Sequence, residues 1–313
     1  MRRTLNGISI SSALFLLLVY WQRPDWASAV TIFPAWSWLI IWGLSLPAYR
    51  RASFKFACML WLLFTFSFVE EIKSLSRLLR PEHYITSQLK VITVNCSGSI
   101  DALLSALELG PDIVLIQETP QRNTVLEWVK QNSDYQYAHG VDTSILVKGH
   151  IQHIGTTASF FNTAWAEIRG TQYHITSLRL ATSNPRIDLW NANCWTQQRL
   201  QRERQMEQID KVVQALPSAS SDRTILLGGD FNVAQGDRVF QAIDTRLRDS
   251  FATGGRGWCN TIMHSMPLLR IDQIWASIDL HAHDAHVAEA ANTDHLMYVA
   301  AFSQAPPYGK VDK

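Results

Sequence analysis

The chain has 313 residues, of which 47% are hydrophobic and 18% are charged, and its formal net charge is +1. This composition excludes a disordered or fibrous protein, and the near-neutral charge removes any global electrostatic argument for a polyanionic partner. The four cysteines, Cys58, Cys96, Cys194 and Cys259, form no CxxC pair, so the sequence gives no basis for a cysteine zinc site. A disulfide between Cys194 and Cys259 is left open.

Residues 1–70 read as three hydrophobic segments, over residues 8–21, 26–49 and 52–69, separated by short polar breaks. The second segment carries no charge, and as one helix it is long enough to cross the roughly 30 Å of a bilayer's hydrocarbon. Several tryptophans in this region suit anchoring at the membrane interface. We therefore predict two or three transmembrane helices, the number depending on the short first segment, and a lipid bilayer as partner.

Basic residues predict the orientation of these helices. Arg2 and Arg3 precede the first segment, and Arg50, Arg51 and Lys55 lie between the second and the third. Cytoplasmic loops carry an excess of lysine and arginine, so both groups are expected on the cytoplasmic side. The rest of the chain would then face the periplasm or the exterior from the cell (inner) membrane.

From residue 71 onward the chain changes character. A connector is expected over residues 71–87, a folded domain over 88–304 and a tail over 305–313. Short apolar runs predict strands at 89–94, 112–116, 144–147, 173–178, 224–227, 271–275 and 297–301, and helices are expected after residue 99 and over 202–216. Strands outnumber helices, which favours an α+β fold with two packed sheets flanked by helices, a four-layer αββα sandwich.

Polar side chains recur where these strands end or begin. Such groups are costly to bury unless they pair with one another or hold a cation. Carboxylate oxygens favour Mg²⁺ or Mn²⁺ over zinc, and an acidic cluster with one histidine suits hydrolysis of a phosphate ester. The residues in question are Asn95, Glu118, Asp230, Asn232, Asp272, Asp294 and His295.

Five motifs in chain order resemble the endonuclease/exonuclease/phosphatase superfamily, which includes DNase I-like nucleases, sphingomyelinases and inositol phosphatases. They are VITVNC at 91–96, DIVLIQE at 112–118, LLGGDFNV at 226–233, LLRIDQIWAS at 268–277 and TDH at 293–295. The resemblance extends over residues 89–302. It implies the same four-layer sandwich and a hydrolase that depends on Mg²⁺ or Mn²⁺.

The resemblance also implies a role for each matched residue. Glu118 would be the principal metal ligand, with Asn95 beside it and Asp294 completing the metal and water network.

Four further roles follow in the same way. Asp230 would orient or activate the attacking water, and Asn232 would hold a phosphate oxygen. His295 would contact the scissile phosphate, and Asp272 would fix the tautomer of His295 and raise its pKa.

One residue departs from the family pattern. Many members carry a histidine in an Asn-Thr-His-Leu context, and here the corresponding stretch is ITSLRL at 175–180, with Arg179 in the histidine's place. Arginine stays protonated and cannot act as a general acid, but it can clamp a phosphate oxygen with two hydrogen bonds. A catalytic clamp and a surface salt bridge are both open readings of Arg179.

Three other segments are less specific. Residues 186–204 mix arginines with Trp190 and Trp195, as either a substrate-facing loop or a solvated helix start. The glycine-rich turn at 254–258 is expected to border the site by family resemblance. His281, His283 and His286 are interpreted as part of a solvated loop near a strand.

These observations predict a membrane-anchored, metal-dependent phosphoesterase. Its substrate would be a phosphodiester or phosphomonoester in a nucleic acid, a phospholipid or a small molecule, and nuclease activity is one of the open possibilities. The alternative is a binding or scaffold domain of the same fold that has lost turnover, which Arg179 supports. No protein partner is predicted.

Overall fold

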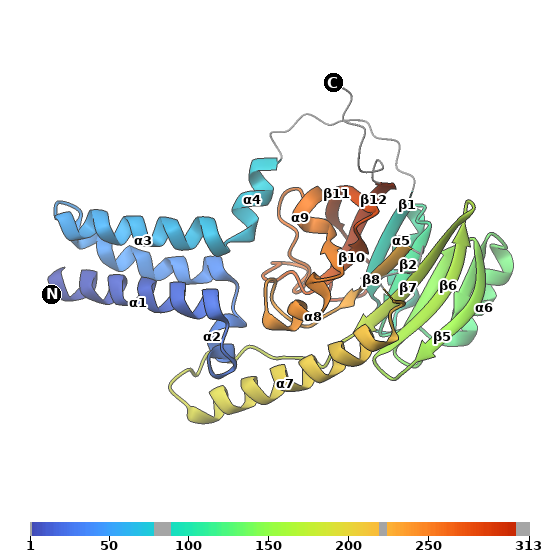
Figure 1. Ribbon diagram of the computed structural model, residues 1–313, viewed down its shortest axis with the longest axis horizontal. Helices are drawn as coiled ribbons and strands as arrows, with labels where there is room; N and C mark the ends of the chain where they lie inside the picture. Colours follow the sequence, from blue (N-terminus) through green and yellow to red (C-terminus); the bar gives the residue numbers. More distant parts are fainter. Residues whose placement is uncertain (1, 78–88, 219–223, 305–313) are drawn as a thin grey trace, which may run out of the picture.

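The computed structural model describes residues 2–77, 89–218 and 224–304, which form a bundle of helices and a β-sandwich (Figure 1). The bundle contains α1 (Arg2–Gln22), η1 (Asp25–Ala27), α2 (Ser28–Thr31), η2 (Ala35–Ala48) and α3 (Ala52–Phe68). Its small core includes Leu16, Tyr20, Trp61 and Phe64.

The segment 26–49 is not the single helix that its apolar character predicts. The pair η1–α2 and the helix η2 are bent by 76° at the break between them. Pro34 lies at this break in an extended conformation, and a proline pushes the preceding residue out of the helical region. Among the described residues, α1 alone is long and apolar enough to cross a membrane, and the bent pair is a second candidate if it counts as one span.

Helix α4 (Glu70–Arg77) connects the bundle to the sandwich. Ser74 Oγ donates to Gly257 O at 2.6 Å, and Arg77 Nε donates to Gly255 O at 2.6 Å, so α4 is bonded to the sandwich along its length. The predicted connector therefore begins as a docked helix. Its remainder, 78–87, and the predicted tail, 305–313, lie outside the described residues.

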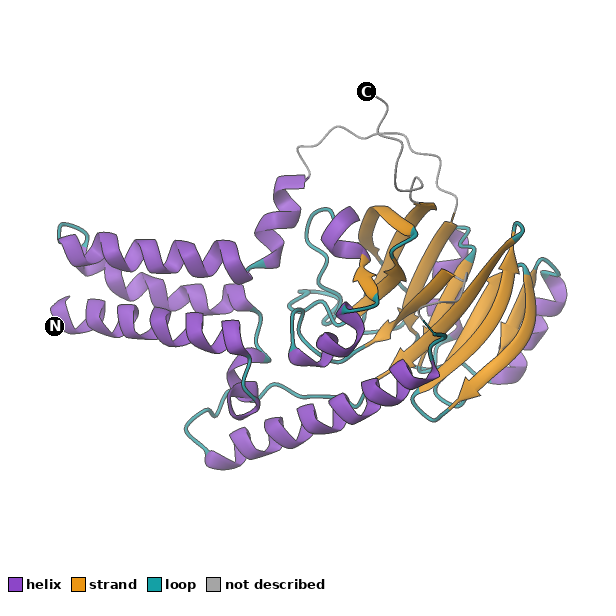
Figure 2. Ribbon diagram, in the orientation of Figure 1, coloured by secondary structure: helices purple, strands orange, loops and turns teal. Residues whose placement is uncertain are grey.

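Two mixed six-stranded sheets make up the sandwich (Figure 2). The first sheet has the order β11-β12-β1-β2-β4-β3, with β1 (Leu89–Asn95), β2 (Ile113–Gln117), β3 (Tyr135–Ala138), β4 (Thr143–Lys148), β11 (Leu280–Ala288) and β12 (Met297–Gln304). The second has the order β5-β6-β7-β8-β10-β9, with β5 (His150–Thr157), β6 (Phe161–Ile168), β7 (Thr171–Arg179), β8 (Thr224–Asp230), β9 (Leu247–Asp249) and β10 (Asp272–Ser277). Strands β1 and β2 are parallel, as are β7 and β8.

Helices cover the outer face of each sheet. The main core lies between the sheets and includes Val91, Leu115, Ile175 and Leu226. Helices α5 (Ile100–Glu108) and α6 (Arg122–Gln131) pack outside the first sheet, and α7 (Ala192–Ala215), η3 (Arg238–Phe240) and α8 (Gln241–Asp244) outside the second. A short helix, α9 (Ser250–Gly254), lies against β11. The four-layer sandwich predicted from the sequence is confirmed.

All seven predicted strands are present, and β3, β5, β6, β9 and β11 were not predicted. Strand β5 is exposed along most of its length, so it lacks the apolar run that marks a buried strand. Strand β11 contains His281, His283 and His286, so the predicted loop is wrong. Helix α7 begins at Ala192, ten residues before the predicted start. All four cysteines are free, so Cys194 and Cys259 form no disulfide.

Candidate active site

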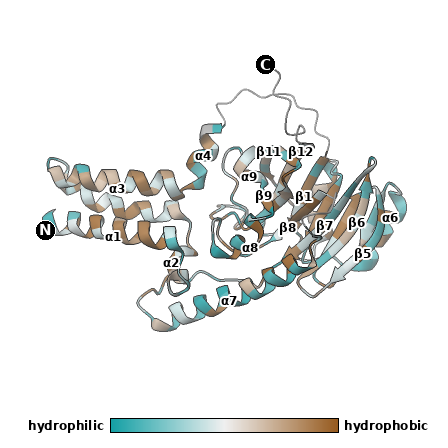
Figure 3. Ribbon diagram, in the orientation of Figure 1, coloured by the Kyte–Doolittle hydropathy of each residue, from teal (hydrophilic) through white to brown (hydrophobic). Residues whose placement is uncertain are grey.

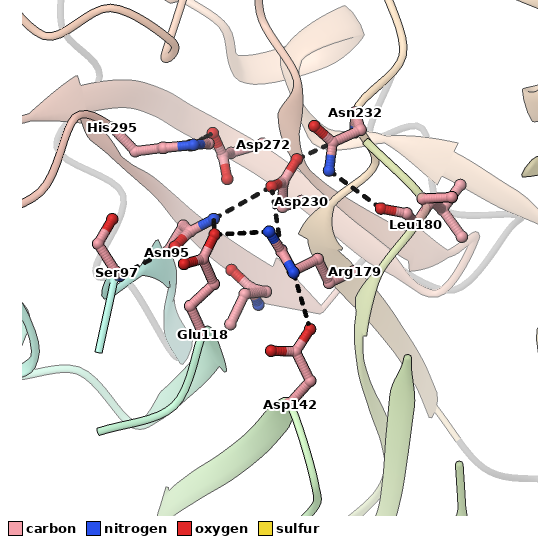
Figure 4. Close-up of polar contacts among 12 residues, drawn as sticks. Asn95, Ser97, Glu118, Asp142, Arg179, Leu180, Asp230, Asn232, Asp272 and His295 are labelled. Atoms are coloured by element: carbon pink, nitrogen blue, oxygen red, sulfur yellow. Dashed lines mark hydrogen bonds and ion pairs between the residues drawn. The ribbon is translucent and has the colours of Figure 1, made fainter. Parts of the chain in front are cut away.

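The predicted site residues come together where the strands of the two sheets end (Figure 4). Asn95 is the last residue of β1, and Glu118 follows β2 directly. The two residues lie close together because these parallel strands end at the same edge of the sheet. Asp230 ends β8, and Asp272 begins the antiparallel neighbour β10, which places the two in register. Because the sheets pack face to face, residues from both sheets meet on one surface, which we call the floor of the site.

The backbone around the floor has unusual conformations. Gly229 has φ of 146°, and a Cβ atom there would lie 1.9 Å from Leu178 O, so only glycine fits. Glu118 and Asn232 have positive φ values of 45° and 52°. Such conformations cost about 1–3 kcal/mol each and occur often at functional sites, where the surrounding structure enforces them.

His295 is buried and paired with Asp272. Its Nδ1 lies 2.8 Å from Asp272 Oδ2, a contact in which Asp272 accepts from the protonated nitrogen. Burial alone would lower the pKa of His295, but the charge of Asp272 and this hydrogen bond outweigh it and raise the pKa to about 10. Asp272 therefore favours the positively charged form of His295.

Asp230 lies beside this pair. Its Oδ2 accepts from Asn95 Nδ2 at 3.1 Å, and its Oδ1 accepts from the backbone N–H of Asn232 at 2.9 Å. Burial, followed by the nearby charge of Asp272, raises the pKa of Asp230 to about 7. Asn232 is held in turn by a hydrogen bond from its Nδ2 to Leu180 O at 3.0 Å.

Arg179 lies on the floor among three carboxylates (Figure 4). Its Nη2 is 2.7 Å from Glu118 Oε1, its Nη1 is 3.2 Å from Asp142 Oδ2, and its Nε is 3.9 Å from Asp230 Oδ2. Burial works against the charged form, but Asp142 and Glu118 outweigh it and raise the pKa of Arg179 further. A salt bridge is thus present, but it lies inside the site and not on an unrelated surface.

Oxygen donors from several elements fit a divalent cation. Ligand atoms of Asp230, Asp272 and His295 lie within 4.8 Å of one another, the one group among the described residues that could hold a metal ion. Because His295 is protonated, the two carboxylates are the available donors of this group. Asp272 Oδ1 is buried without a hydrogen-bond partner, an arrangement that is costly unless a cation or water contacts the oxygen. The donor set and this oxygen therefore suit a hard cation.

Of the three predicted metal ligands, Glu118 and Asn95 lie together on the floor and Asp294 lies apart from them. Glu118 Oε1 accepts from Asn95 Nδ2 at 3.1 Å, so these two lie together. Asn95 turns its amide nitrogen to the carboxylates, because its Oδ1 accepts from the backbone N–H of Ser97. Asp294 is at the rim, 73% exposed, with its Oδ1 4.0 Å from His295 Nε2.

Two residues of the site were missed from the sequence. Asp142 precedes β4, and the register of β4 with β2 pairs Thr143 with Gln117, which brings Asp142 opposite Glu118. An aspartate directly before a buried strand was the available signal. Ser97 Oγ donates to Asp294 Oδ1 at 3.2 Å, and nothing in the sequence distinguished it from an ordinary turn residue.

A cleft of about 350 Å³ opens above this floor. Its walls include residues 182–185 and apolar side chains of the segment 262–271. The turn at 254–258 was expected here, but it contacts α4 through Gly255 and Gly257, and Trp258 packs against Trp36. The segment 186–204 forms the end of a loop and the start of α7, outside the lining of the cleft.

Comparisons with known proteins agree with this fold. The family model described as "Endonuclease/Exonuclease/phosphatase family" matches residues 92–295. No curated protein matches the chain.

Solved structures of other proteins are similar to the sandwich. One is a humanized D. rerio TDP2 with 14 mutations, at TM-score 0.52 and 18% identity, covering 69% of this chain and 99% of that one. Another is an endonuclease/exonuclease/phosphatase from Bacteroides vulgatus, at TM-score 0.54 and 13% identity, with the same coverage. A mannosyl-6-phosphatase from Bacteroides thetaiotaomicron has TM-score 0.50 and 16% identity, covering 69% of this chain and 100% of that one. At these identities the likeness establishes the fold alone.

Proposed function

Because this chain belongs to the endonuclease/exonuclease/phosphatase family, we propose that it is a membrane-anchored phosphoesterase that depends on Mg²⁺ or Mn²⁺. The observation that carries the proposal is the convergence of Glu118 and Asp230 with two cationic side chains, Arg179 and His295, on the floor of one cleft. Asp272 lies behind the floor and pairs with His295. Hydrolysis of a phosphate ester needs positive charge to stabilise the anionic phosphate and its leaving group. It also needs a negatively charged group to take a proton from the attacking water.

The cation would be held among Asp230, Asp272 and Glu118, with Asn95 and Asp294 beside them. When bound, it would neutralise charge on the phosphate and favour attack by water. Asp272 Oδ1, which is buried and without a partner, is the atom that most needs such a ligand.

The remaining side chains have roles that follow from their positions. His295, held as a cation by Asp272, would stabilise negative charge on a phosphate oxygen or on the leaving group. Asp230, fixed by its hydrogen bonds to Asn95 and to the backbone of Asn232, would accept a proton from the attacking water. On substrate binding, an N–H group of Arg179 would turn away from Glu118 and donate a hydrogen bond to a phosphate oxygen.

Membrane anchoring is supported by the surface of the bundle. Figure 3 shows apolar residues along α1 and α3. Large apolar side chains there are exposed, which is unusual for a soluble protein surface. They include Leu14, Leu18, Ile40, Leu46, Met59, Leu63 and Phe66.

The helix lengths also agree with a bilayer. The 21 residues of α1 extend over about 32 Å and the 17 of α3 over about 26 Å at the rise of an α-helix. The 14 residues of η2 extend over about 28 Å at the rise of a 3₁₀-helix, so all three helices are close to the roughly 30 Å of hydrocarbon. We therefore propose three spans, which counts α3 in addition to α1 and the bent pair although α3 is shorter than these two candidates. The arginines at 50 and 51 would then be cytoplasmic, and the sandwich would lie on the other side of the inner membrane.

A binding domain without turnover is the second candidate, and Arg179 is the observation that favours it. Its guanidinium already neutralises Glu118 and Asp142, which weakens the demand for a metal cation.

One experiment decides between the two. The full chain in detergent would be assayed on bis-p-nitrophenyl phosphate with Mg²⁺, with Mn²⁺ and with EDTA, beside His295→Ala and Glu118→Ala. We expect turnover with either metal, none with EDTA, and losses in both variants. A folded protein that hydrolyses nothing with any metal would establish the binding domain instead.

A further inference from the structure

The catalytic cleft is closed on one side by the helical bundle. Ile32, in the break between α2 and η2, lines the same cleft as Glu118 and Arg179. Arg202 of α7 fixes this part of the bundle, since its Nη2 donates to Thr31 Oγ1 at 2.6 Å and to Asp237 Oδ2 at 2.5 Å. The proposed anchor thus contributes directly to the wall of the proposed active site.

The two loops that form the other walls also contact the end of the bundle. The loop at 182–191 leads to Trp195, which stacks on Trp26 with ring centroids 6.3 Å apart. The loop at 257–269 begins with Trp258, which packs on Trp36 at 5.8 Å. Tryptophans concentrate at the interface between hydrocarbon and water in membrane proteins. These two pairs therefore place the mouth of the cleft at the level of that interface.

Both loops carry exposed apolar side chains. Ile187 and Trp190 on the first are 80% and 85% exposed, and Met263 and Met266 on the second are 47% and 58% exposed. In Figure 1 the loop before α7 and the loops beside α8 and α9 lie on the side of the sandwich that faces the bundle. Apolar tips in these positions are suited to contact with lipid.

The distribution of charge in the cleft disfavours a nucleic acid as the substrate. Among the described residues that line it, the only cationic groups are Arg179 and His295, and both are on the floor. The walls carry Ile262, Met263 and Leu268 in place of the lysines and arginines that neutralise a polynucleotide backbone.

We propose that the substrate is a phosphate ester of a bilayer lipid, taken from the leaflet in which the bundle ends. The inference rests on the proposed phosphoesterase function and adds the substrate class to it. The lipid phosphate would lie on the floor, and its glycerol and the first acyl carbons would lie along Ile32, Met263 and Leu268. A water oxygen forms the new bond to phosphorus, the bond to the ester oxygen on the leaving side breaks, and that oxygen takes up a proton.

The test compares substrates on the full-length protein reconstituted into phosphatidylcholine vesicles. The substrates are phosphatidic acid and phosphatidylglycerol in the bilayer, bis-p-nitrophenyl phosphate in solution, and plasmid and single-stranded DNA. We expect hydrolysis of at least one of the two lipids, with kcat/KM above that for DNA. Vesicles containing that lipid should also inhibit hydrolysis of the soluble ester competitively.

A matched pair of variants tests the apolar wall. Met263→Glu puts a charge on the wall, and Ile278→Glu puts one on a similarly exposed site after β10, at the end opposite Asp272. We expect Met263→Glu to lower the ratio of lipid to soluble-ester turnover about tenfold or more, the effect of losing one apolar side-chain contact. Ile278→Glu should leave both rates close to wild type.

The outcomes separate the two proposals. Hydrolysis of the soluble ester together with preference for DNA, no lipid turnover, or an unchanged ratio in Met263→Glu would overturn the lipid inference and leave the phosphoesterase standing. Absence of turnover on every ester in the folded wild-type protein would overturn both. Competitive inhibition is measured on wild-type protein, so it decides the point even where Met263→Glu fails to fold.

Discussion

Arg179 is the last residue of β7, and its contacts give it a distinct chemistry. Its guanidinium bridges Glu118 from β2 and Asp142 before β4, while its Nε faces Asp230. The salt bridge joins elements of both sheets at the floor. A side chain in this position both holds carboxylates in place and offers positive charge to a phosphate.

We predict that Arg179→Met lowers kcat on bis-p-nitrophenyl phosphate about 100-fold, the usual effect of removing one group that stabilises transition-state charge. Arg179→Lys should lower kcat less, because lysine keeps the positive charge but cannot donate two parallel hydrogen bonds. Removing the cation should also tighten Mg²⁺ binding, which isothermal titration would measure. Unchanged kcat together with unchanged Mg²⁺ affinity would show that Arg179 serves structure alone.

His295 and Asp272 should act as a unit, because the 2.8 Å hydrogen bond orients the ring and maintains its charge. We expect His295→Gln to lower kcat about 10²–10⁴-fold and Asp272→Asn to lower it by a similar factor. The double variant should be little worse than either single one, as measured by a kinetic double-mutant cycle. Additive losses would mean that the two side chains work independently.

At the scale of elements, buried ion pairs join the bundle to the sandwich. Arg270, which precedes β10, is almost completely buried and lies 2.9 Å from Glu70 Oε1 of α4 and 2.6 Å from Asp249 Oδ2 of β9. Its guanidinium also lies over the ring of Phe251, 4.7 Å from the centroid. One side chain therefore connects α4 to β9 and α9, which are far from α4 in sequence.

We predict that Arg270→Met lowers the free energy of unfolding by about 3–5 kcal/mol, because two carboxylates are left without their partner in a buried site. Thermal unfolding in detergent, followed by circular dichroism, measures the loss. Arg199→Met is the control, since Arg199 forms an exposed pair with Glu203 at 3.6 Å and such pairs contribute little. Equal melting temperatures for the two variants would contradict the assignment.

At the scale of the whole molecule, the proposed membrane orientation predicts which surfaces can be labelled from outside the cell. The native cysteines permit labelling of introduced ones, because burial raises the pKa of Cys259 to about 12 and leaves little reactive thiolate, and Cys96 and Cys194 are also buried. Lys148→Cys introduces an exposed thiol on the sandwich, and Arg51→Cys introduces one between η2 and α3.

In intact cells whose outer membrane has been permeabilised, we expect a membrane-impermeant maleimide to label Lys148→Cys and to leave Arg51→Cys unlabelled until the cells are lysed. The reverse pattern would place the sandwich in the cytoplasm. Labelling of wild-type protein in the same cells reports any contribution from Cys58.

The sequence by itself determined the architecture of the sandwich and most of the candidate site. Strands β1, β8 and β10 are short apolar runs that end or begin with Asn95, Asp230 and Asp272, and Glu118 directly follows the apolar run of β2. Both the strands and their chemistry are therefore local features of the chain. Strand β5, which escaped prediction, is largely exposed and gains its stability from its neighbour β6 rather than from its own apolar pattern.

Only the tertiary structure decided which of these residues touch and what stands around them. The partnership of Arg179 with Asp142 depends on strand register, and the presence of Ile32 in the wall of the cleft depends on the packing of the bundle against α7. Contacts between segments far apart in sequence produce no local periodicity or composition from which they could be predicted. For that reason the family could be inferred from the chain alone, whereas the contribution of Ile32 to the wall of the cleft could not.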